Sequence, residues 1–131
     1  MKKSINVVAA VIKKENLYFC AQRPDRGELA KKWEFPGGKI ESNESHEEAL
    51  VREIKEELDS IIKIKEYILT VEHEYETFYL IMHCYLCELV EGVLKNKEHI
   101  NTAWLTIDEM YKYDFAEADK PILKFLESNY R

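Results

Sequence analysis

Three glutamates, Glu53, Glu56 and Glu57, stand three and four residues apart. On an α-helix such positions lie on one face, because residues three and four apart are neighbours on the helix surface. Few Lys or Arg residues stand four positions away, so this face is self-repelling rather than crossed by ion pairs. Hard oxygen ligands of this kind suit Mg²⁺, which commonly bridges protein carboxylates and substrate phosphates. The spacing therefore indicates a cation site, with a solvated acidic surface as the alternative.

The helix that would present these glutamates is predicted over residues 46–58. Ser45 stands three residues before Glu48, which is the spacing of a capping box at a helix start. An apolar stripe at helical spacing follows, formed by Ala49, Leu50, Val51, Ile54 and Leu58. A Pro-Gly-Gly turn is expected at 36–38, where the small glycines would let backbone carbonyls approach whatever the glutamates hold.

The rest of the chain alternates between strand-like and helix-like segments. Strands are predicted at 5–13, 17–23, 33–35, 61–72, 77–90 and 102–105, and helices at 107–113 and 120–128. Elements mixed in this order predict an α/β fold, with a mixed sheet covered by helices on both faces. We expect one domain over residues 1–131, since a chain of this length can bury a single core.

The composition argues against several classes of protein. No apolar run is long enough to span a membrane. The N-terminal apolar run at 5–12 is followed by lysines without a small-residue cleavage site, so we interpret it as a strand. The formal net charge of −6 argues against binding polymeric nucleic acid, which needs clustered Lys and Arg. A small phosphorylated substrate stays possible, because a bound cation can reverse the local sign of charge.

The cysteines and histidines do not suggest a transition-metal site. Cys84 and Cys87 form a C-x-x-C pair, but residues three apart on a strand point to opposite faces. We expect all three cysteines to be buried and reduced, as in a cytoplasmic protein. Structural or solvent-facing roles are expected for the four histidines, which are His46, His73, His83 and His99.

The glutamates belong to a longer pattern, whose fixed positions are Gly38, Glu44, Arg52, Glu53, Glu56 and Glu57. Their types and spacing resemble the signature of the Nudix hydrolase family, in its MutT-like form, over about residues 38–60. Matching flanks extend the similarity over nearly the whole chain: Ala21–Arg23, Trp33–Pro36 and Ala116–Pro121. The resemblance implies a Nudix α/β/α sandwich with a mixed central sheet.

One departure from the family pattern lies at the end of the signature. Asp59 and Ser60 stand where the family usually has Gly and an aliphatic residue. That glycine normally serves the helix C-terminus, where positive φ is common. Asp tolerates the left-handed conformation better than most residues, so the turn is expected to survive at a modest cost in stability.

The resemblance implies Mg²⁺-dependent hydrolysis of a nucleoside diphosphate linked to another group, with Mn²⁺ as a possible substitute. The metal ligands that it implies are the carbonyl of Gly37 and the carboxylates of Glu53, Glu56, Glu57 and Glu98. For Glu98, an ordinary loop carboxylate is the alternative.

The resemblance also implies catalytic roles. Glu53 would activate the attacking water. Arg52 would orient Glu53 through a bidentate ion pair, and Glu44 would support the cluster from behind. Lys39 would neutralise charge on the departing phosphate.

The substrate-binding residues that the resemblance implies are Arg23, Phe35 and Asp119. Arg23 would contact phosphate or sugar, although an exposed arginine at a strand end is equally ordinary. Asp119 stands where MutT-like enzymes acting on 8-oxo-dGTP carry Asn, and with its flanks it resembles the CTP pyrophosphohydrolase branch. An ionised carboxylate only accepts hydrogen bonds, so it suits the cytosine amine or the guanine N–H groups but repels cytosine N3 unless protonated. Asp119 as the N-cap of the last helix is the alternative.

The predicted function is hydrolysis of (d)CTP or of modified and oxidised (d)NTPs to the monophosphate and pyrophosphate, which would clean the nucleotide pool and so assist DNA repair. The alternatives are an 8-oxo-dGTP diphosphatase, a non-catalytic nucleotide-binding module on the same fold, and an acidic interaction helix on an unrelated domain. The expected partner is a small nucleoside triphosphate, with no polymeric nucleic acid and no membrane. We expect a cytoplasmic monomer or homodimer.

Overall fold

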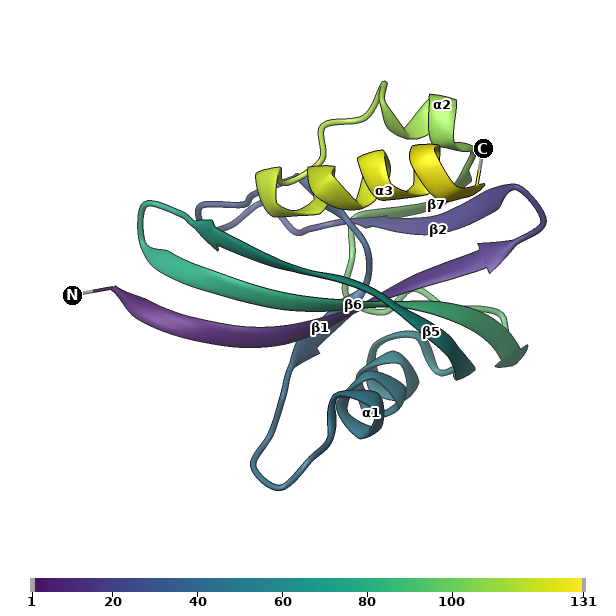
Figure 1. The fold of residues 1–131 in the computed structure, drawn as a ribbon, viewed down its shortest axis with the longest axis horizontal. Coiled ribbons are helices and arrows are strands. Elements are labelled where there is room, and N and C mark those ends of the chain that lie inside the picture. Colours follow the sequence, from purple (N-terminus) through teal and green to yellow (C-terminus); the bar gives the residue numbers. More distant parts are fainter. Residues whose placement is uncertain (1, 131) are drawn as a thin grey trace.

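Strand β1 (Lys3–Lys14) lies at the centre of the computed structural model, which describes residues 2–130. It pairs in parallel with β6 (Phe78–Glu91) over most of its length, and its end pairs antiparallel with β2 (Leu17–Gln22). The strand order is β3-β2-β1-β6-β5, with β4 added on β1 and β7 on β2 (Figure 1). Parallel and antiparallel neighbours of β1 make the sheet mixed, as predicted.

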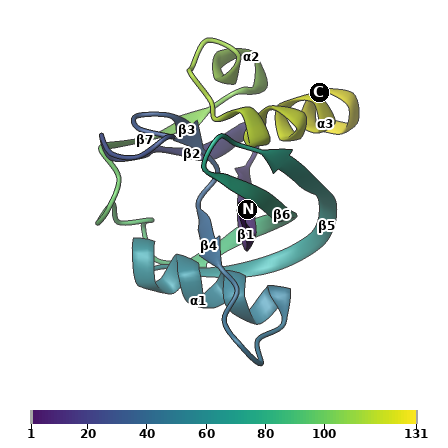
Figure 2. The same cartoon turned by 90° about the vertical axis from the view of Figure 1, so that its left-hand side faces the viewer.

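The other strands flank this centre, and they are β3 (Trp33–Glu34), β4 (Gly37–Lys39), β5 (Ile61–Glu74) and β7 (Asn101–Leu105). Helix α1 (His46–Leu58) covers one face of the sheet. The opposite face carries α2 (Ile107–Met110), the 3₁₀ turn η1 (Glu117–Asp119) and α3 (Lys120–Tyr130). Figure 2 shows the sheet between these two helical layers, which confirms the α/β/α architecture.

Residues of β1 supply both hydrophobic cores, because successive side chains on a strand point to opposite faces. Val8, Ala10 and Ile12 join the core beneath α1, whereas Ala9 and Val11 join the core beneath α3. All five are at most 1% exposed. Burial of each larger aliphatic side chain contributes about 1.5–3 kcal/mol, so the two cores hold the helices on either side of one strand.

The same alternation settles the C-x-x-C pair on β6. Cys84 lies in the core beneath α3, and Cys87 lies in the core beneath α1. Both thiols are buried and unpaired, as is that of Cys20, which confirms the expectation of reduced structural cysteines. Within the described residues, no helix combines the length and apolar character needed to cross a bilayer.

The prediction of a turn at residues 36–38 is wrong. Gly37 and Gly38 belong to β4 and pair with Ala9 and Val8 of β1. Neither glycine has a positive φ, so a turn conformation is not the reason for them. At Gly37 a Cβ atom would lie 1.9 Å from the carbonyl oxygen of Val8, so this glycine allows two backbones to approach closely.

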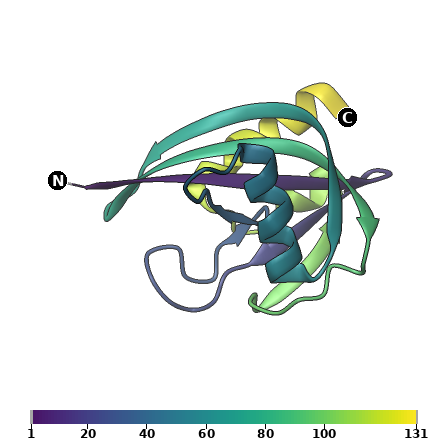
Figure 3. The ribbon, with the colours of Figure 1, turned by 90° about the horizontal axis from the view of Figure 1, so that it is seen from below.

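Helix α1 begins and ends as the sequence predicts, and Figure 3 shows it lying across the strands of the sheet. Ser45 and Glu48 form both bonds of the capping box. Asp59 takes the left-handed conformation with φ of 48°, which confirms that Asp can replace the usual glycine. Ser60 is buried, and its hydroxyl donates to the carbonyl of Leu58 and accepts from the backbone N–H of Leu94.

The second helix is shorter than predicted. It ends at Met110 rather than at residue 113, because the chain then turns back towards β3. There the carbonyl of Asp114 accepts a 2.9 Å hydrogen bond from the backbone N–H of Trp33. This turn brings the segment before α3 beside the strand that leads into the glycines.

Candidate active site

Glu53 of α1 lies directly against β4. A Cβ atom at Gly38 would be 1.9 Å from Glu53 Oε2, so only glycine leaves room for this carboxylate. The sequence expectation that the glycines and the glutamates come together is therefore met, although the glycines act from a strand. Helix α1 buries Ile54 in the core, and this packing places the neighbouring Glu53 against the backbone of β4.

Arg52 links the glutamates. Its Nε donates to Glu44 Oε2 at 2.5 Å and its Nη2 donates to Glu44 Oε1 at 2.9 Å. Its Nη1 donates to Glu53 Oε1 and to Glu56 Oε1, each at 2.9 Å, and Nη2 also reaches the Lys39 carbonyl at 3.0 Å. The bidentate pair predicted with Glu53 is thus formed with Glu44. The loop carboxylate faces the fork of the guanidinium, whereas a neighbour on the same helix meets only one nitrogen.

Glu57 carries the buried carboxylate of the group. Burial raises the pKa of Glu57 to about 9, with the charge of Glu53 and a side-chain hydrogen bond with Glu98 adding to the effect. Its Oε2 is buried and has no hydrogen-bond partner among residues 2–130. Burial also raises the pKa of Glu53, while the hydrogen bond from Arg52 opposes that change. Desolvated carboxylates at such close quarters favour a cation between them.

The donor set fits a hard divalent cation, because a buried carboxylate oxygen without a partner stands among other carboxylates. In the present arrangement of side chains in residues 2–130, however, no three His, Cys, Asp or Glu residues are grouped so that they could hold a metal ion. Glu56 is 56% exposed and bonds to Arg52, and Glu98 is exposed on the loop between β6 and β7.

A cavity of about 430 Å³ opens beside these carboxylates. Its lining is chemically mixed. The apolar side chains include those of Ile5, Leu29, Tyr75, Phe78, Leu80 and Met82. The ionisable side chains include those of Arg23, Glu34, Lys39, Glu57, Glu98 and Asp119. Such a cavity offers an apolar surface for a ring and charged groups for an anion and its cation.

Asp119 lies in this cavity wall at the end of η1. Its side chain is 4% exposed, and its Oδ2 accepts a 3.0 Å hydrogen bond from the backbone N–H of Phe35. Burial raises the pKa of Asp119 well above its ordinary value. The carboxyl therefore bonds to the backbone just after β3. It does not cap the first turn of α3, which was the alternative prediction. Phe35 lines the cavity, and its ring packs on that of Phe115 with ring centroids 5.7 Å apart.

Two residues of the cavity escaped the sequence reasoning. Glu34 accepts from Arg23 Nη1 at 3.2 Å and bonds to His99 Nε2 at 3.2 Å. The His99 side chain is only 4% exposed. Nothing in a single sequence reveals that residues 23, 34 and 99 meet, because the contact depends on the pairing of β2 with β3 and β7.

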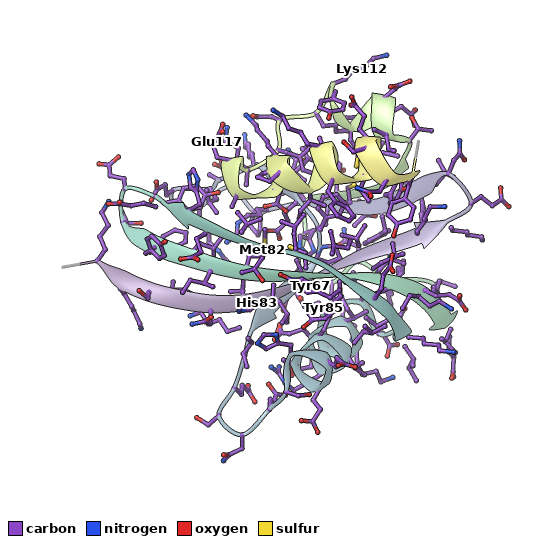
Figure 4. All side chains as sticks on the ribbon, in the orientation of Figure 1. Tyr67, Met82, His83, Tyr85, Lys112 and Glu117 are labelled. Atoms are coloured by element: carbon purple, nitrogen blue, oxygen red, sulfur yellow. The ribbon has the colours of Figure 1, made fainter. Side chains whose placement is uncertain are left out.

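His46 and His83 take structural positions, as expected. His83 stacks on His46 of α1 with ring centroids 4.1 Å apart, and His46 Nδ1 lies 3.1 Å from the Tyr85 hydroxyl. Figure 4 shows His83 and Tyr85 on the α1 side of β6, whereas Met82 lies towards α3. None of the side chains of His46, His83 and Tyr85 lines the cavity.

Comparisons with known proteins agree with this geometry. Residues 7–125 match the family model of the NUDIX domain. The chain is 37% identical over 122 residues to the CTP pyrophosphohydrolase of Escherichia coli (strain K12). The aligned region covers 93% of this chain and 90% of that protein. It is 38% identical over 98 residues to the 8-oxo-dGTP diphosphatase of Proteus vulgaris, over 74% of this chain and 88% of that one. The solution structure of the DNA mismatch repair protein MutT, a Nudix hydrolase from methicillin-resistant Staphylococcus aureus 252, shares 40% identity with a TM-score of 0.78, over 98% of this chain and 100% of that one.

Proposed function

The chain belongs to the Nudix hydrolase family, and from this premise we propose that it is a metal-dependent nucleoside triphosphate pyrophosphohydrolase with a preference for cytosine nucleotides. The observation that carries the proposal is the cavity whose lining joins the half-buried Glu57 to the buried Asp119 and to apolar side chains. Membership of the family makes the interpretation as an acidic interaction helix on an unrelated domain wrong.

Mg²⁺ is the proposed cofactor, with Mn²⁺ as a substitute. Glu53, Glu56, Glu57, Glu98 and the carbonyl of Gly37 would hold it, and the partnerless Oε2 of Glu57 supports this assignment. A divalent cation bound there would offset the charge of the substrate phosphates and lower the pKa of a water molecule.

The protein groups supply the rest of the chemistry. Glu53 is the proposed base, which takes a proton from the water that forms a bond to phosphorus. As that bond forms, a phosphoanhydride P–O bond breaks, and the nucleoside monophosphate and pyrophosphate separate. Arg52 holds Glu53 Oε1 at 2.9 Å and thereby fixes the base. Lys39, which lines the cavity, would stabilise the charge that develops on the departing phosphate.

Asp119 is the proposed contact to the base. Because Oδ2 already accepts from the Phe35 N–H, a neutral Asp119 carries its proton on the other oxygen and can donate to an acceptor. Cytosine N3 is such an acceptor. The raised pKa of Asp119 therefore supports the neutral form that removes the repulsion expected for an ionised carboxylate. Arg23 lines the same cavity and would contact phosphate or sugar.

A second candidate is 8-oxo-dGTP as the main substrate, because two relatives with 38% and 30% identity are 8-oxo-dGTP diphosphatases. An ionised Asp119 would accept from the guanine N–H groups. One experiment tests both candidates: kcat/KM with Mg²⁺ for CTP, dCTP, dGTP, 8-oxo-dGTP and 5-substituted dCTP, with pyrophosphate and phosphate measured separately. Pyrophosphate release that is fastest from cytosine nucleotides is expected, and binding without turnover would favour the non-catalytic module.

The cysteines bear on the proposed location of the enzyme in the cell. Three unpaired buried thiols suit a reducing compartment, so we propose that the enzyme acts on free nucleotides in the cytoplasm.

A further inference from the structure

The loop between β6 and β7, residues 92–100, carries Glu98 and is held to the rest of the molecule at both ends. At its start, the Leu94 N–H donates to Ser60 Oγ at 2.8 Å and the Lys95 N–H donates to the Leu58 carbonyl at 2.8 Å. At its end, the Ile100 N–H donates to the carbonyl of Gln22 at 2.9 Å. The loop therefore connects the end of α1 to β2.

Between these anchors the loop closes on itself around Glu98. The Asn96 side chain accepts from the His99 N–H at 3.0 Å and donates to the His99 carbonyl at 2.9 Å. This reciprocal pair fixes the backbone on either side of residue 98. A contact from this unit to another element would add to the anchors at the two ends of the loop.

His99 makes that contact. Its side chain leaves the loop, is 4% exposed, and places Nε2 3.2 Å from Glu34 Oε2. A carboxylate only accepts, so Nε2 is the donor. The other oxygen of Glu34 accepts from Arg23 Nη1 at 3.2 Å. Because each oxygen of Glu34 has a partner, this carboxylate is an anchor rather than a free ligand.

We propose that His99 is a positioning residue, which fixes Glu98 beside Glu57 by tying the β6–β7 loop to Glu34. The inference rests on the proposed function in one respect, since it takes Glu98 as a ligand of the divalent cation. His99 itself touches neither the cation nor the substrate in this assignment. It supplies the rigidity that a ligand on an exposed loop lacks.

The affinity for Mn²⁺ alone, measured by titration with electron paramagnetic resonance and without nucleotide, tests the inference. His99→Phe keeps a planar ring but removes the donor, and about 10-fold weaker binding is expected, the scale of losing a residue that orients a metal ligand. His99→Gln keeps an N–H donor and should bind within about 3-fold of the parent. Asn101→Ala removes a 2.8 Å side-chain bond to Gln22 just beyond the loop and should leave the affinity unchanged.

The sign of the effect separates positioning from electrostatics. If His99 only neutralised Glu34, its removal would leave Oε2 of Glu34 without a partner near the cation, and binding would become tighter. Weaker binding therefore supports positioning, and equal or tighter binding overturns it.

A double-mutant comparison tests whether His99 acts through Glu98. In a Glu98→Gln background, His99→Phe should cause no further loss of Mn²⁺ affinity. An undiminished loss in that background would overturn the inference. A parent protein that binds no Mn²⁺ would overturn the proposed cofactor and this inference together. A parent that binds normally, with an unchanged His99→Phe variant, overturns the inference alone.

Discussion

The Asp119 carboxylate accepts a 3.0 Å hydrogen bond from the backbone N–H of Phe35 in the buried wall of the cavity. The bond joins the turn before α3 to the end of β3, 84 positions away in sequence. Burial raises the pKa of Asp119 well above its ordinary value, the charge of Glu34 adds to this, and the Phe35 N–H and Arg23 oppose it. The fold therefore holds a carboxyl that resists ionisation in the wall of the cavity.

The stability of the protein should depend on pH through this group. Between the ordinary pKa of 3.8 and the raised folded value, the folded state binds more protons, so the stabilisation from Asp119 is complete below 3.8 and is lost as pH rises through the folded value. Asp119→Asn cannot ionise. Its melting temperature relative to that of the parent should therefore rise as pH increases above 3.8. A difference that does not change with pH would contradict this. Glu74→Gln removes a carboxylate whose pKa is lowered by Lys2, so it should show no such gain.

Glu53→Gln should reduce kcat at least about 100-fold, because the amide cannot accept a proton from water. The amide oxygen can still accept from Arg52 Nη1, so the melting temperature should stay close to that of the parent. Glu47→Gln, an exposed change on the same helix, is the matched control and should retain activity. Near-normal turnover by the Glu53 variant would remove it from the role of base.

The two glycines of β4 should respond differently to alanine. At Gly38 the new Cβ would meet the Glu53 carboxylate at 1.9 Å, so that side chain must move and activity should fall at least about 10-fold, with a small change in stability. At Gly37 it would meet the backbone of Val8 at 1.9 Å, so the pairing of β4 with β1 should suffer and the melting temperature should fall. Kinetics and thermal melts of both variants check this. Equal losses of stability would contradict it.

Ser60→Ala should destabilise the protein without abolishing catalysis. The change leaves the buried N–H of Leu94 without an acceptor, which costs about 1–3 kcal/mol. Denaturant unfolding measures the loss. Ser42→Ala, in the exposed loop before α1, is the control and should change stability little. Unchanged stability of the Ser60 variant would mean that another group satisfies Leu94.

Periodic local patterns made most of the fold predictable. The capping box at Ser45 and the apolar stripe ending at Leu58 are properties of neighbouring residues, so the bounds of α1 follow from the sequence alone. The same holds for the opposite orientations of Cys84 and Cys87 on β6. The prediction of a turn at residues 36–38 is wrong because glycine also allows two strands to approach closely, and that use depends on a partner distant in sequence.

The family resemblance pointed to residues well outside the helix motif: Arg23, Lys39, Phe35 and Asp119 all line the cavity. Glu53 and Glu57 follow from helical spacing and from the family resemblance. The anchoring of Glu34 by His99 does not, because it needs the pairing of three strands that are far apart in sequence. The bidentate pairing of Arg52 with Glu44 depends on how a loop folds back, which no periodicity encodes.

The preference for a base should change with pH if Asp119 reads it. The neutral carboxyl donates to cytosine N3, whereas the ionised form repels N3 and accepts from guanine N–H groups. For the parent, kcat/KM for dCTP relative to that for dGTP should therefore fall as pH rises through the raised pKa of Asp119. Complete ionisation of Asp119 leaves a buried group without a suitable partner, which costs about 1–3 kcal/mol. The ratio of the two kcat/KM values should therefore change roughly 5- to 150-fold.

The substitution Asp119→Asn completes this test. Its amide accepts from the Phe35 N–H and donates from the other arm at every pH, so the ratio of dCTP to dGTP should be independent of pH in this variant. Taking the ratio cancels the pH dependence that Glu53 and the cation give to both substrates alike. If Asp119 only holds the backbone of Phe35, the ratio of dCTP to dGTP should be independent of pH in the parent as well. That result would remove Asp119 from base recognition while leaving the hydrolytic site intact.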